Sequence, residues 1–210
     1  MDLFKKKKEL PNLEQKSKEA FTIKTTPEIP SFKDIPKEQV DVKYELLAPY
    51  AYAHIKWSEK EKELIYHLEE PLLETYERKV LNILEDGIKE LLNISFLSST
   101  DGETTIQYLE KNVKALLSEL RIKLEKESYL KIMYYVYRDF VGLNKIEPLL
   151  NDYFIEDIEC NGAGYPIYIV HRKFRNVKTN VVFKEMSELA NFVEKLAQKC
   201  GQYISYANPL

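Results

Sequence analysis

The residues best placed to do chemistry form a short basic run, His171-Arg172-Lys173-Phe174-Arg175, directly after an apolar stretch rich in β-formers. An arginine guanidinium presents a planar fork of N–H donors that holds two phosphate oxygens at once. A turn at the end of a strand would display these side chains on a rigid base. The run therefore predicts a phosphate-binding turn. The alternative is a solvent-facing basic loop, or one whose arginines pair with nearby glutamates.

Three carboxylates, Glu156, Asp157 and Glu159, lie close together on one predicted strand before this run. Such a group is able to serve acid–base catalysis or to bind a divalent ion. Side chains alternate between the two faces of a strand, however, so Glu156 points away from Asp157 and Glu159. Because charged residues also protect sheet edges from pairing with other chains, the pattern favours a solvated strand edge over a catalytic site.

Motifs for nucleotide hydrolysis or metal binding do not occur in the 210 residues. The phosphate loop G-x-x-x-x-G-K-[ST] is absent, and Gly162-x-Gly164 is followed by Ile167 where a dinucleotide-binding loop needs a third glycine. The 3 histidines show no i, i+4 pair, which a helical zinc site would need. The sequence therefore predicts no metal site, no cofactor and no catalytic residue within these 210 residues.

The basic run belongs to a segment, Ile146 to Leu210, that predicts a small sheet covered by a helix. Its β-rich runs are Ile155–Cys160, Pro166–Val170 and Val177–Phe183. Glycines in the stretch 161–164 suit a tight turn between the first two runs. Apolar residues then repeat at helical spacing over 189–200 and stop at Gly201, a typical helix C-cap. Asp152 is expected to turn the chain into the first strand.

The middle of the chain predicts a β-hairpin followed by helices. Alternation over 50–55 and 63–68, on either side of the charged stretch 58–62, is typical of a hairpin with a charged tip. Apolar stripes at helical spacing predict helices over about 71–93, 106–124 and 128–141. We place Pro71 in the first turn of the first helix and Gly142 at the end of the third. Stripes this regular indicate a packed core, and a coiled-coil interaction surface is the alternative.

The last third also resembles a known family. It is similar to the N-terminal domain of archaeal secretion ATPases in the order of its motifs. These are I-x-P-L-L-x-D-x-x-I-E-D-I-x-C-x-G, then His-Arg after a strand, Thr-Asn before an apolar strand, F-V-x-K-L-A-Q-x-x-G and I-S-x-A-x-P-L. These GspE-like and FlaI-like motors power type IV pili and archaella. The matching residues are Ile146, Pro148, Leu149, Leu150, Asp152, Ile155–Ile158, Cys160, Gly162, His171, Arg172, Thr179, Asn180, Phe192–Val193, Lys195–Gln198, Gly201, Ile204, Ser205, Ala207 and Pro209.

The resemblance implies the N-terminal regulatory and docking domain of a hexameric ATPase for archaellum or type IV pilus assembly or related secretion. ATP and Mg²⁺ would then be bound by a RecA-like motor domain beyond Leu210. On this basis Arg172 and Arg175 are candidates to contact ATP phosphates held by the motor, and His171 is a candidate to contact the nucleotide or orient the arginines. The implied partners are the chain's own motor domain, neighbouring subunits, a polytopic membrane platform protein and accessory assembly proteins. A free-standing protein-binding adaptor without nucleotide chemistry is the alternative.

Residues 1–40 differ from the rest of the chain, because prolines interrupt a polar stretch with little periodicity. Such a stretch buries too little to offset its ordering entropy, which predicts a flexible arm. Its candidate docking residues, for a partner or an anionic membrane surface, are Phe4, Lys5, Lys6, Lys7 and Lys8. A solvated, mobile arm is the alternative.

Composition excludes further functional and structural classes. A net charge of −3 argues against a nucleic-acid partner, and 15 tyrosines with 9 phenylalanines argue against overall disorder. Cys160 and Cys200 are predicted to be small core residues. Because no apolar run approaches the roughly 18–20 residues of a spanning helix, we expect a cytoplasmic protein held peripherally at the membrane through its partners.

Together these patterns predict an α/β protein of the α+β type. Residues 1–40 form the flexible arm and 41–145 a hairpin with a helix-rich subdomain. Residues 146–210 form a small antiparallel three-stranded sheet covered by a helix, which leads to the implied motor domain. The described fragment is not expected to be an enzyme by itself.

Overall fold

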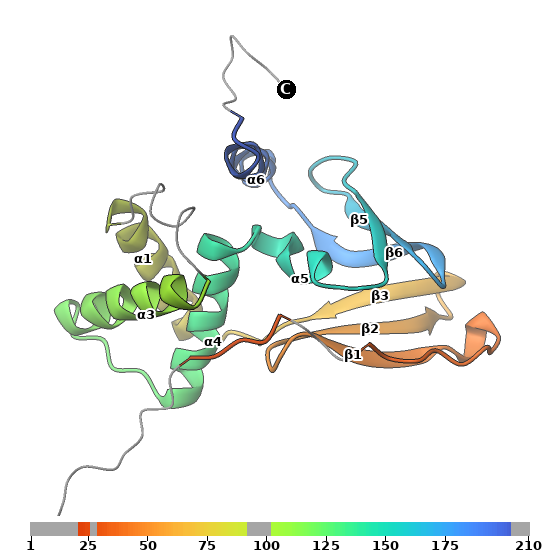
Figure 1. The fold of residues 1–210 in the computed structure, drawn as a ribbon, viewed down its shortest axis with the longest axis horizontal. Coiled ribbons are helices and arrows are strands. Elements are labelled where there is room, and N and C mark those ends of the chain that lie inside the picture. The colour runs from red at the N-terminus through yellow and green to blue at the C-terminus, as the bar shows by residue number, and fades with distance from the viewer. Residues whose placement is uncertain (1–20, 26–28, 92–101, 203–210) are drawn as a thin grey trace, which may run out of the picture.

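Six strands form a single sheet in the order β1-β2-β3-β6-β5-β4 (Figure 1). The computed structural model describes residues 21–25, 29–91 and 102–202. The strands are β1 (Asp41–Leu47), β2 (Ala51–Ser58), β3 (Glu63–Glu69), β4 (Ile155–Glu159), β5 (Pro166–His171) and β6 (Arg175–Val182). Neighbouring strands are antiparallel except β3 and β6, which run parallel. The sheet thus consists of two antiparallel units joined along one parallel seam.

This seam corrects the predicted three-stranded sheet. The α+β class is confirmed, but β4–β6 continue the sheet of β1–β3 through the pairing of Ile65 with Lys178. Residues 64–66 are all buried, as in a strand with neighbours on both sides and both faces covered. Farther along, the Asn180 side chain replaces backbone pairing: its Oδ1 accepts from the Leu68 N–H at 2.8 Å and its Nδ2 donates to the Leu68 carbonyl at 3.0 Å.

The predicted hairpin is formed by β2 and β3. Ser58 pairs with Glu63, so the charged tip is made by the four residues between them. Along β2 the small apolar residues Ala51 and Ala53 are completely buried, whereas His54 lies on the opposite, partly exposed face. This alternation places the hydrophobic face of the sheet on the core and confirms the hairpin.

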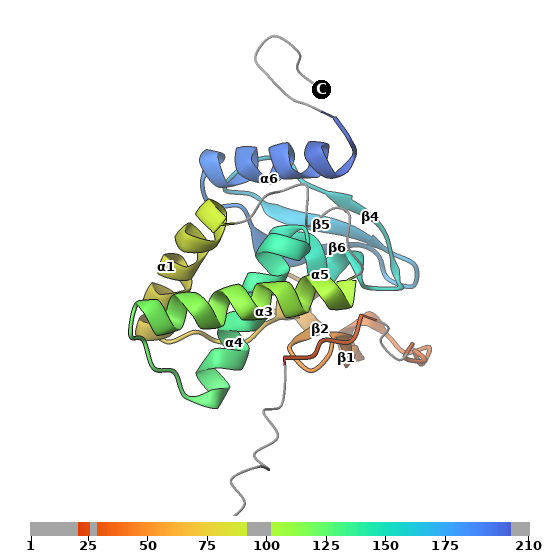
Figure 2. The same ribbon diagram turned by 60° about the vertical axis from the view of Figure 1, so that its left-hand side comes forward.

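The helices lie beyond one end of the sheet and above it (Figures 1 and 2). They are α1 (Thr75–Leu91), α3 (Gly102–Glu119), α4 (Lys126–Val136), the short α5 (Glu147–Leu150) and α6 (Met186–Lys199). α1, α3 and α4 group together, α5 leads into β4, and α6 lies apart from the other long helices. Among the helices of the described residues, none is long and apolar enough to cross a membrane.

The start of α1 differs from the prediction. The helix begins at Thr75, so Pro71 precedes it instead of lying in its first turn. Glu77 reaches back and accepts a hydrogen bond from the Glu74 N–H at 2.7 Å, which is one half of a capping box. The glutamate cap therefore sets the helix start, and Pro71 remains in the connection from β3.

The third helix was predicted to end at Gly142, and the helical run that begins with α4 ends there. α4 passes into a π-helical turn, Tyr137–Val141, and the Gly142 N–H donates to the Tyr137 carbonyl at 3.1 Å. A Cβ atom at Gly142 would lie 2.5 Å from the Glu147 Cγ and 2.7 Å from the Arg138 carbonyl oxygen. The chain therefore turns so tightly at this point that no side chain fits without moving the backbone.

The C-terminal elements follow the predicted order. Gly162 and Gly164 have positive φ angles of 120° and 82° in the connection between β4 and β5. α6 ends in a Schellman motif, in which the Gly201 N–H donates to the Gln198 carbonyl and the Gln202 N–H donates to the Ala197 carbonyl. Gly201 has a φ angle of +70° and directly follows the C-cap residue Cys200, so the predicted glycine stop of this helix is confirmed.

The described part of the first 40 residues contributes to the core, although the sequence predicted a flexible arm there. Phe21 is 3% exposed and stacks on Tyr50 with 5.4 Å between ring centroids. Phe32 packs edge-on against Phe154 at 4.6 Å. Two aromatic anchors bury enough surface to order a polar segment. Phe4 and Lys5–Lys8, the predicted docking residues, lie outside the described residues.

The two cysteines are exposed, so their prediction as core residues is wrong. Cys160 follows β4, and Cys200 is the C-cap of α6. Both lie where a secondary-structure element ends. Each is a free thiol at the surface.

Candidate functional site

The predicted basic turn connects β5 to β6. His171 ends β5, Arg175 begins β6, and the two residues pair across a three-residue turn, 172–174. Arg175 has a φ angle of +63°, in the left-handed region. Turns of this length usually place glycine at that position, and an L-residue there costs roughly 1–2 kcal/mol. The turn therefore depends on other contacts to keep its shape.

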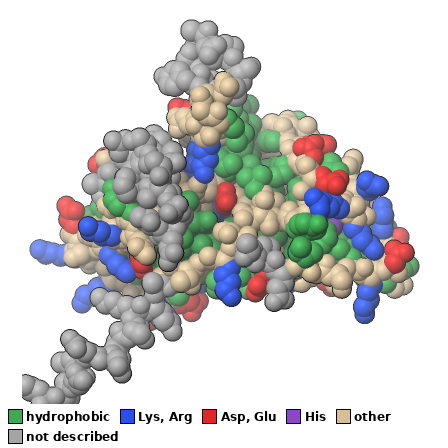
Figure 3. Space-filling view, in the orientation of Figure 1, with side chains coloured by type: hydrophobic (Ala, Val, Ile, Leu, Met, Phe, Trp, Pro, Cys, Tyr) green, Lys and Arg blue, Asp and Glu red, His purple; other side chains and the backbone are tan. Residues whose placement is uncertain are grey.

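The basic side chains of the turn have different surroundings. The Arg172 guanidinium lies 4.4 Å from the Tyr153 ring centroid and 3.6 Å from the Glu156 carboxylate. Lys173 lies 3.5 Å from a carboxylate in the segment before β1. Arg175 is exposed and makes no ion pair with any described residue. Exposed pairs contribute less than about 1 kcal/mol, so both arginines are available to a phosphate. Lysine and arginine side chains, with carboxylates among them, lie at the right-hand end of the face shown in Figure 3.

His171 lies beneath the turn and is fully buried. Its ring stacks on Phe154 with 5.4 Å between centroids, and the Phe174 and Phe32 rings lie 4.9 Å and 5.6 Å away. The Nδ1 atom accepts hydrogen bonds from the backbone N–H groups of Lys173 at 3.2 Å and Phe174 at 3.3 Å. His171 was a candidate to contact nucleotide, but in this structure its ring supports the turn from inside and does not line its surface.

A buried carboxylate lies next to this histidine. Asp152 accepts the hydroxyl hydrogens of Tyr44 at 2.6 Å and Tyr66 at 2.7 Å on Oδ2, and the Phe154 N–H at 2.8 Å on Oδ1. The Tyr44 hydroxyl also lies 3.5 Å from the His171 Nε2. Burial raises the pKa of Asp152, and this effect is larger than that of the hydrogen bonds, which lower the pKa. The predicted role of Asp152 in turning the chain into β4 is confirmed, and the cluster ties β1, β3 and β5 together.

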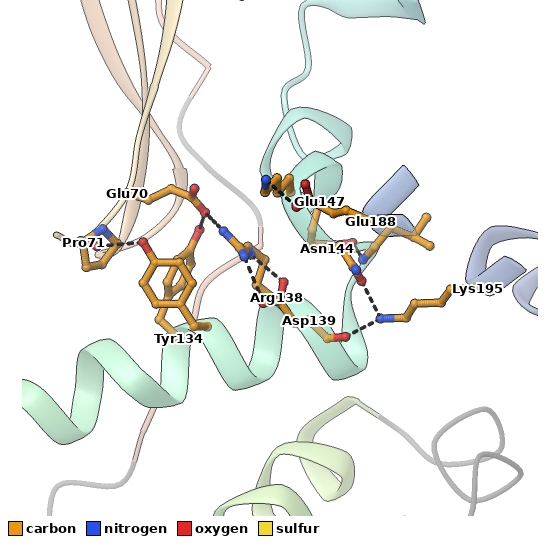
Figure 4. A network of polar contacts seen from close by, with 12 residues as sticks. Glu70, Pro71, Tyr134, Arg138, Asp139, Asn144, Glu147, Glu188 and Lys195 are labelled. Atoms are coloured by element: carbon orange, nitrogen blue, oxygen red, sulfur yellow. Dashed lines mark hydrogen bonds and ion pairs between the residues drawn. The ribbon is translucent and has the colours of Figure 1, made fainter. Parts of the chain in front are cut away.

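A second polar network joins the sheet to the helices (Figure 4). Arg138, in the π-helical turn, is 7% exposed and donates to the Glu70 carboxylate at 2.8 Å and to Asp139 at 2.7 and 2.9 Å. Glu70, which follows β3, also accepts the Tyr134 hydroxyl hydrogen at 2.7 Å. Burial by itself would lower the pKa of Arg138, but Asp139 and Glu70 raise it above its ordinary value. Arg138 therefore stays charged and anchors α4 to the end of β3.

The same network extends to α6. Lys195 donates to the Asp139 carbonyl at 2.5 Å and to the Asn144 Oδ1 at 3.0 Å (Figure 4). Burial lowers the pKa of Lys195 to about 8, and burial with the nearby Asp139 charge raises the pKa of Glu85 to about 7. Because the carbonyl groups at the end of a helix carry partial negative charge, the Lys195 ammonium group is attracted to the end of the π-helical turn. α6 is thus docked on the helical part through a lysine.

The carboxylates before the turn form a strand edge. Glu156, Asp157 and Glu159 are all exposed on β4, which is the last strand of the sheet. No cluster of histidine, cysteine, aspartate or glutamate within the described ranges has the arrangement needed for a metal ion. The exposed arginines of the turn are suited to binding an anion.

Sequence reasoning missed several residues that shape this site. Tyr44 and Tyr66 converge on Asp152, which lies 108 and 86 residues away from them in the chain, and Arg138 meets Glu70 across 68 residues. The available signal was weak: each tyrosine occupies an inward position on a strand whose other inward residues are apolar. A tyrosine hydroxyl at such a position needs a buried polar partner.

No known protein-family profile matches the chain. Among the proteins similar to it are two from the archaeon Methanocaldococcus jannaschii. The uncharacterized protein MJ1288 is 33% identical over 156 residues, which cover 74% of this chain and 62% of MJ1288. The uncharacterized protein MJ0900 is 33% identical over 90 residues, which cover 43% of this chain and 16% of MJ0900. The chain therefore spans less than two thirds of the first relative and a small part of the second.

Proposed function

We propose that this chain is a docking and regulatory domain of a hexameric ATPase that powers archaellum or type IV pilus assembly or related secretion. The observation that carries the proposal is the β5–β6 turn, where Arg172 and Arg175 project from a hairpin. Beneath it, the rings of Phe32, Phe154 and Phe174 surround the buried His171; we call these three rings the aromatic cage. A rigid base lets an arginine meet a phosphate without losing much conformational freedom. The resemblance over residues 146–209 to secretion ATPases supports the same function.

In this function the chain does not hydrolyse ATP itself. ATP and Mg²⁺ are bound by a separate motor domain, and the arginines of the turn approach the phosphates from outside. The match to MJ0900 supports a modular arrangement, because a segment of 90 residues makes up only 16% of that protein. The proposed partners are the motor domain, neighbouring subunits, a polytopic membrane platform protein and accessory assembly proteins. These partners hold the protein peripherally at the cytoplasmic side of the membrane.

A free-standing protein-binding adaptor is the second candidate, and one observation favours it. Because 156 residues make up 62% of MJ1288, that relative has about 250 residues, and about 95 lie outside the match. This is slightly below the roughly 100–150 residues that are the most common size of one domain. A relative of that size supports a role for this fold without a motor in the same chain. Such an adaptor would use its surface to bind a protein and would need no nucleotide.

The test measures ATP turnover by the natural polypeptide that carries this domain. The variant Arg172→Gln/Arg175→Gly removes both charges, and glycine at 175 also relieves the left-handed backbone. Arg121→Gly is the matched control, because Arg121 is exposed, has a φ angle of +56° and lies at the end of α3. We expect turnover to fall at least about tenfold in the double variant, the effect of losing roughly 1.4 kcal/mol of phosphate binding, and to stay unchanged in the control.

Each outcome decides between the candidates. A natural polypeptide without ATP turnover would overturn the motor function and leave the adaptor in its place. Turnover that is equal in the wild type and in Arg172→Gln/Arg175→Gly would remove the phosphate-contacting role of the turn. A loss of similar size in Arg121→Gly would show that the double variant acts through general charge or stability and not through the turn.

A further inference from the structure

The shape of the basic turn depends on an acceptor inside the protein. The N–H groups of Lys173 and Phe174 point inward toward the buried His171 ring, and both reach its Nδ1 atom. Buried N–H groups need partners, and the described residues provide this nitrogen for both. The Arg172 N–H is held separately by the Phe154 carbonyl at 2.8 Å. The backbone that carries both arginines is therefore fixed from below at three successive residues.

The hydrogen bonds determine which nitrogen of His171 carries the proton. A nitrogen that accepts from two N–H groups has no hydrogen of its own, so the hydrogen must lie on Nε2. The Nε2 atom faces the Tyr44 oxygen at 3.5 Å, and the Tyr44 hydroxyl hydrogen is already donated to Asp152. The Tyr44 oxygen is thus free to accept from Nε2. Burial lowers the pKa of His171 to about 4, which is consistent with a neutral ring.

The other hydrogen bonds to Asp152 are consistent with a hydrogen on Nε2 of His171. We call the chain of contacts from His171 through Tyr44 to Asp152 the relay. Tyr66 donates to the same Asp152 oxygen as Tyr44, and the other oxygen is occupied by the Phe154 N–H. The hydroxyls of Tyr44 and Tyr66 and the Phe154 N–H therefore all donate to Asp152, and Nδ1 of His171 is the acceptor at the opposite end. A hydrogen on Nδ1 would face two N–H groups directly and would push the turn away from the ring.

We infer that His171 is a positioning residue: its neutral tautomer, protonated on Nε2 and held by Tyr44 and Asp152, fixes the backbone that presents Arg172 and Arg175. The functional consequence rests on the proposed function, but the tautomer and the backbone contacts do not. His171 does not touch the ligand of the turn. It acts through the N–H groups of Lys173 and Phe174.

The test uses the whole chain labelled with ¹⁵N. In the wild type at pH 7, the imidazole spectrum is expected to show a protonated Nε2 and an unprotonated Nδ1. His171→Phe fills the cage but removes the acceptor, and we expect amide exchange at Lys173 and Phe174 to become at least tenfold faster. His171→Asn places an oxygen near the former Nδ1 and should restore slow exchange. The amides of β2, in the interior of the sheet, serve as the internal control and should not change.

A Tyr44→Phe variant keeps the inference testable where His171→Phe does not fold. This change leaves Nδ1 as acceptor, so the Lys173 and Phe174 amides should stay protected while the Nε2 hydrogen exchanges faster. A protonated Nδ1 in the wild type, or equal protection of both amides in His171→Phe and the wild type, would overturn the inference. ATP turnover by the natural polypeptide is measured separately. Loss in His171→Phe with recovery in His171→Asn links the relay to function, whereas amide effects without a change in turnover refute only that link.

Discussion

Replacing Arg138 with methionine measures the cost of leaving two partly buried carboxylates without their buried cation. The guanidinium donates to Glu70 at 2.8 Å and to Asp139 at 2.7 and 2.9 Å, in surroundings that leave only 7% of the residue exposed. Methionine has a flexible apolar chain of similar length to the arginine stem, so much of the packing is retained. Removing one partner of a buried ion pair costs about 3–5 kcal/mol. We expect the free energy of unfolding to fall by that amount.

A double variant separates the charge effect from the packing effect. In Glu70→Gln/Arg138→Met the glutamine still accepts the Tyr134 hydroxyl hydrogen, but the uncompensated Glu70 charge is gone. The double variant should therefore be more stable than Arg138→Met by about 1–2 kcal/mol. Lys89→Met is the control, because Lys89 forms an exposed pair with Asp86 at 3.3 Å, and its change should stay within about 0.5 kcal/mol.

The assay is equilibrium unfolding in urea at pH 7, followed by circular dichroism. Urea is preferred because it is uncharged and does not screen ion pairs. A loss below about 1 kcal/mol in Arg138→Met would show that the network contributes little to stability. If the double variant is less stable than the single variant, packing and not the unpaired charge sets the cost, and the reasoning fails.

Three further results are expected. Burial lowers the pKa of His171 from 6.5 to about 4, so the unfolded chain takes up the proton first and stability falls as the pH drops from 6.5 toward 4. In urea unfolding, the stability advantage of the wild type over His171→Asn should therefore shrink by about 2.5 kcal/mol between pH 7.5 and 4.5. An unchanged advantage would contradict this. Gly142→Ala should lose about 2–3 kcal/mol, because its Cβ would overlap Glu147, and a normal thermal midpoint would count against it. Cys160 and Cys200 should both react rapidly with a thiol reagent in the folded protein, and slow reaction of either would refute their exposure.

The local parts of the fold could be predicted from the sequence. Alternation in β2 and β3, the glycines between β4 and β5, and the stripe ending at Gly201 each depend on neighbours within a few residues. The seam between β3 and β6 could not be predicted in this way, because it joins strands that are separated by most of the helices. Its best signal was Asn180, a polar residue within an apolar strand that completes the ladder with its side chain.

The candidate site was predicted in part. The basic turn lies where its sequence placed it, since charge and strand length are local properties. The burial of His171 was not foreseen, because the rings that cover it come from Phe32, Phe154 and Phe174, which lie on three separate segments. The sequence around a histidine at the end of a strand does not show whether its side chain faces water or packs among aromatic rings. Only its position relative to distant aromatic residues decides its role.

The parallel seam between β3 and β6 sets the order in which the sheet assembles. Pairing Ile65 with Lys178 closes a loop that contains α1, α3, α4 and the β4–β5 hairpin. The entropy of that closure must be overcome before the long-range contacts are gained, whereas each hairpin closes over a few residues. We therefore expect refolding to begin in the two antiparallel units and to finish when the Asn180 side chain engages Leu68. The rate at which the complete sheet appears is the rate at which these two units meet.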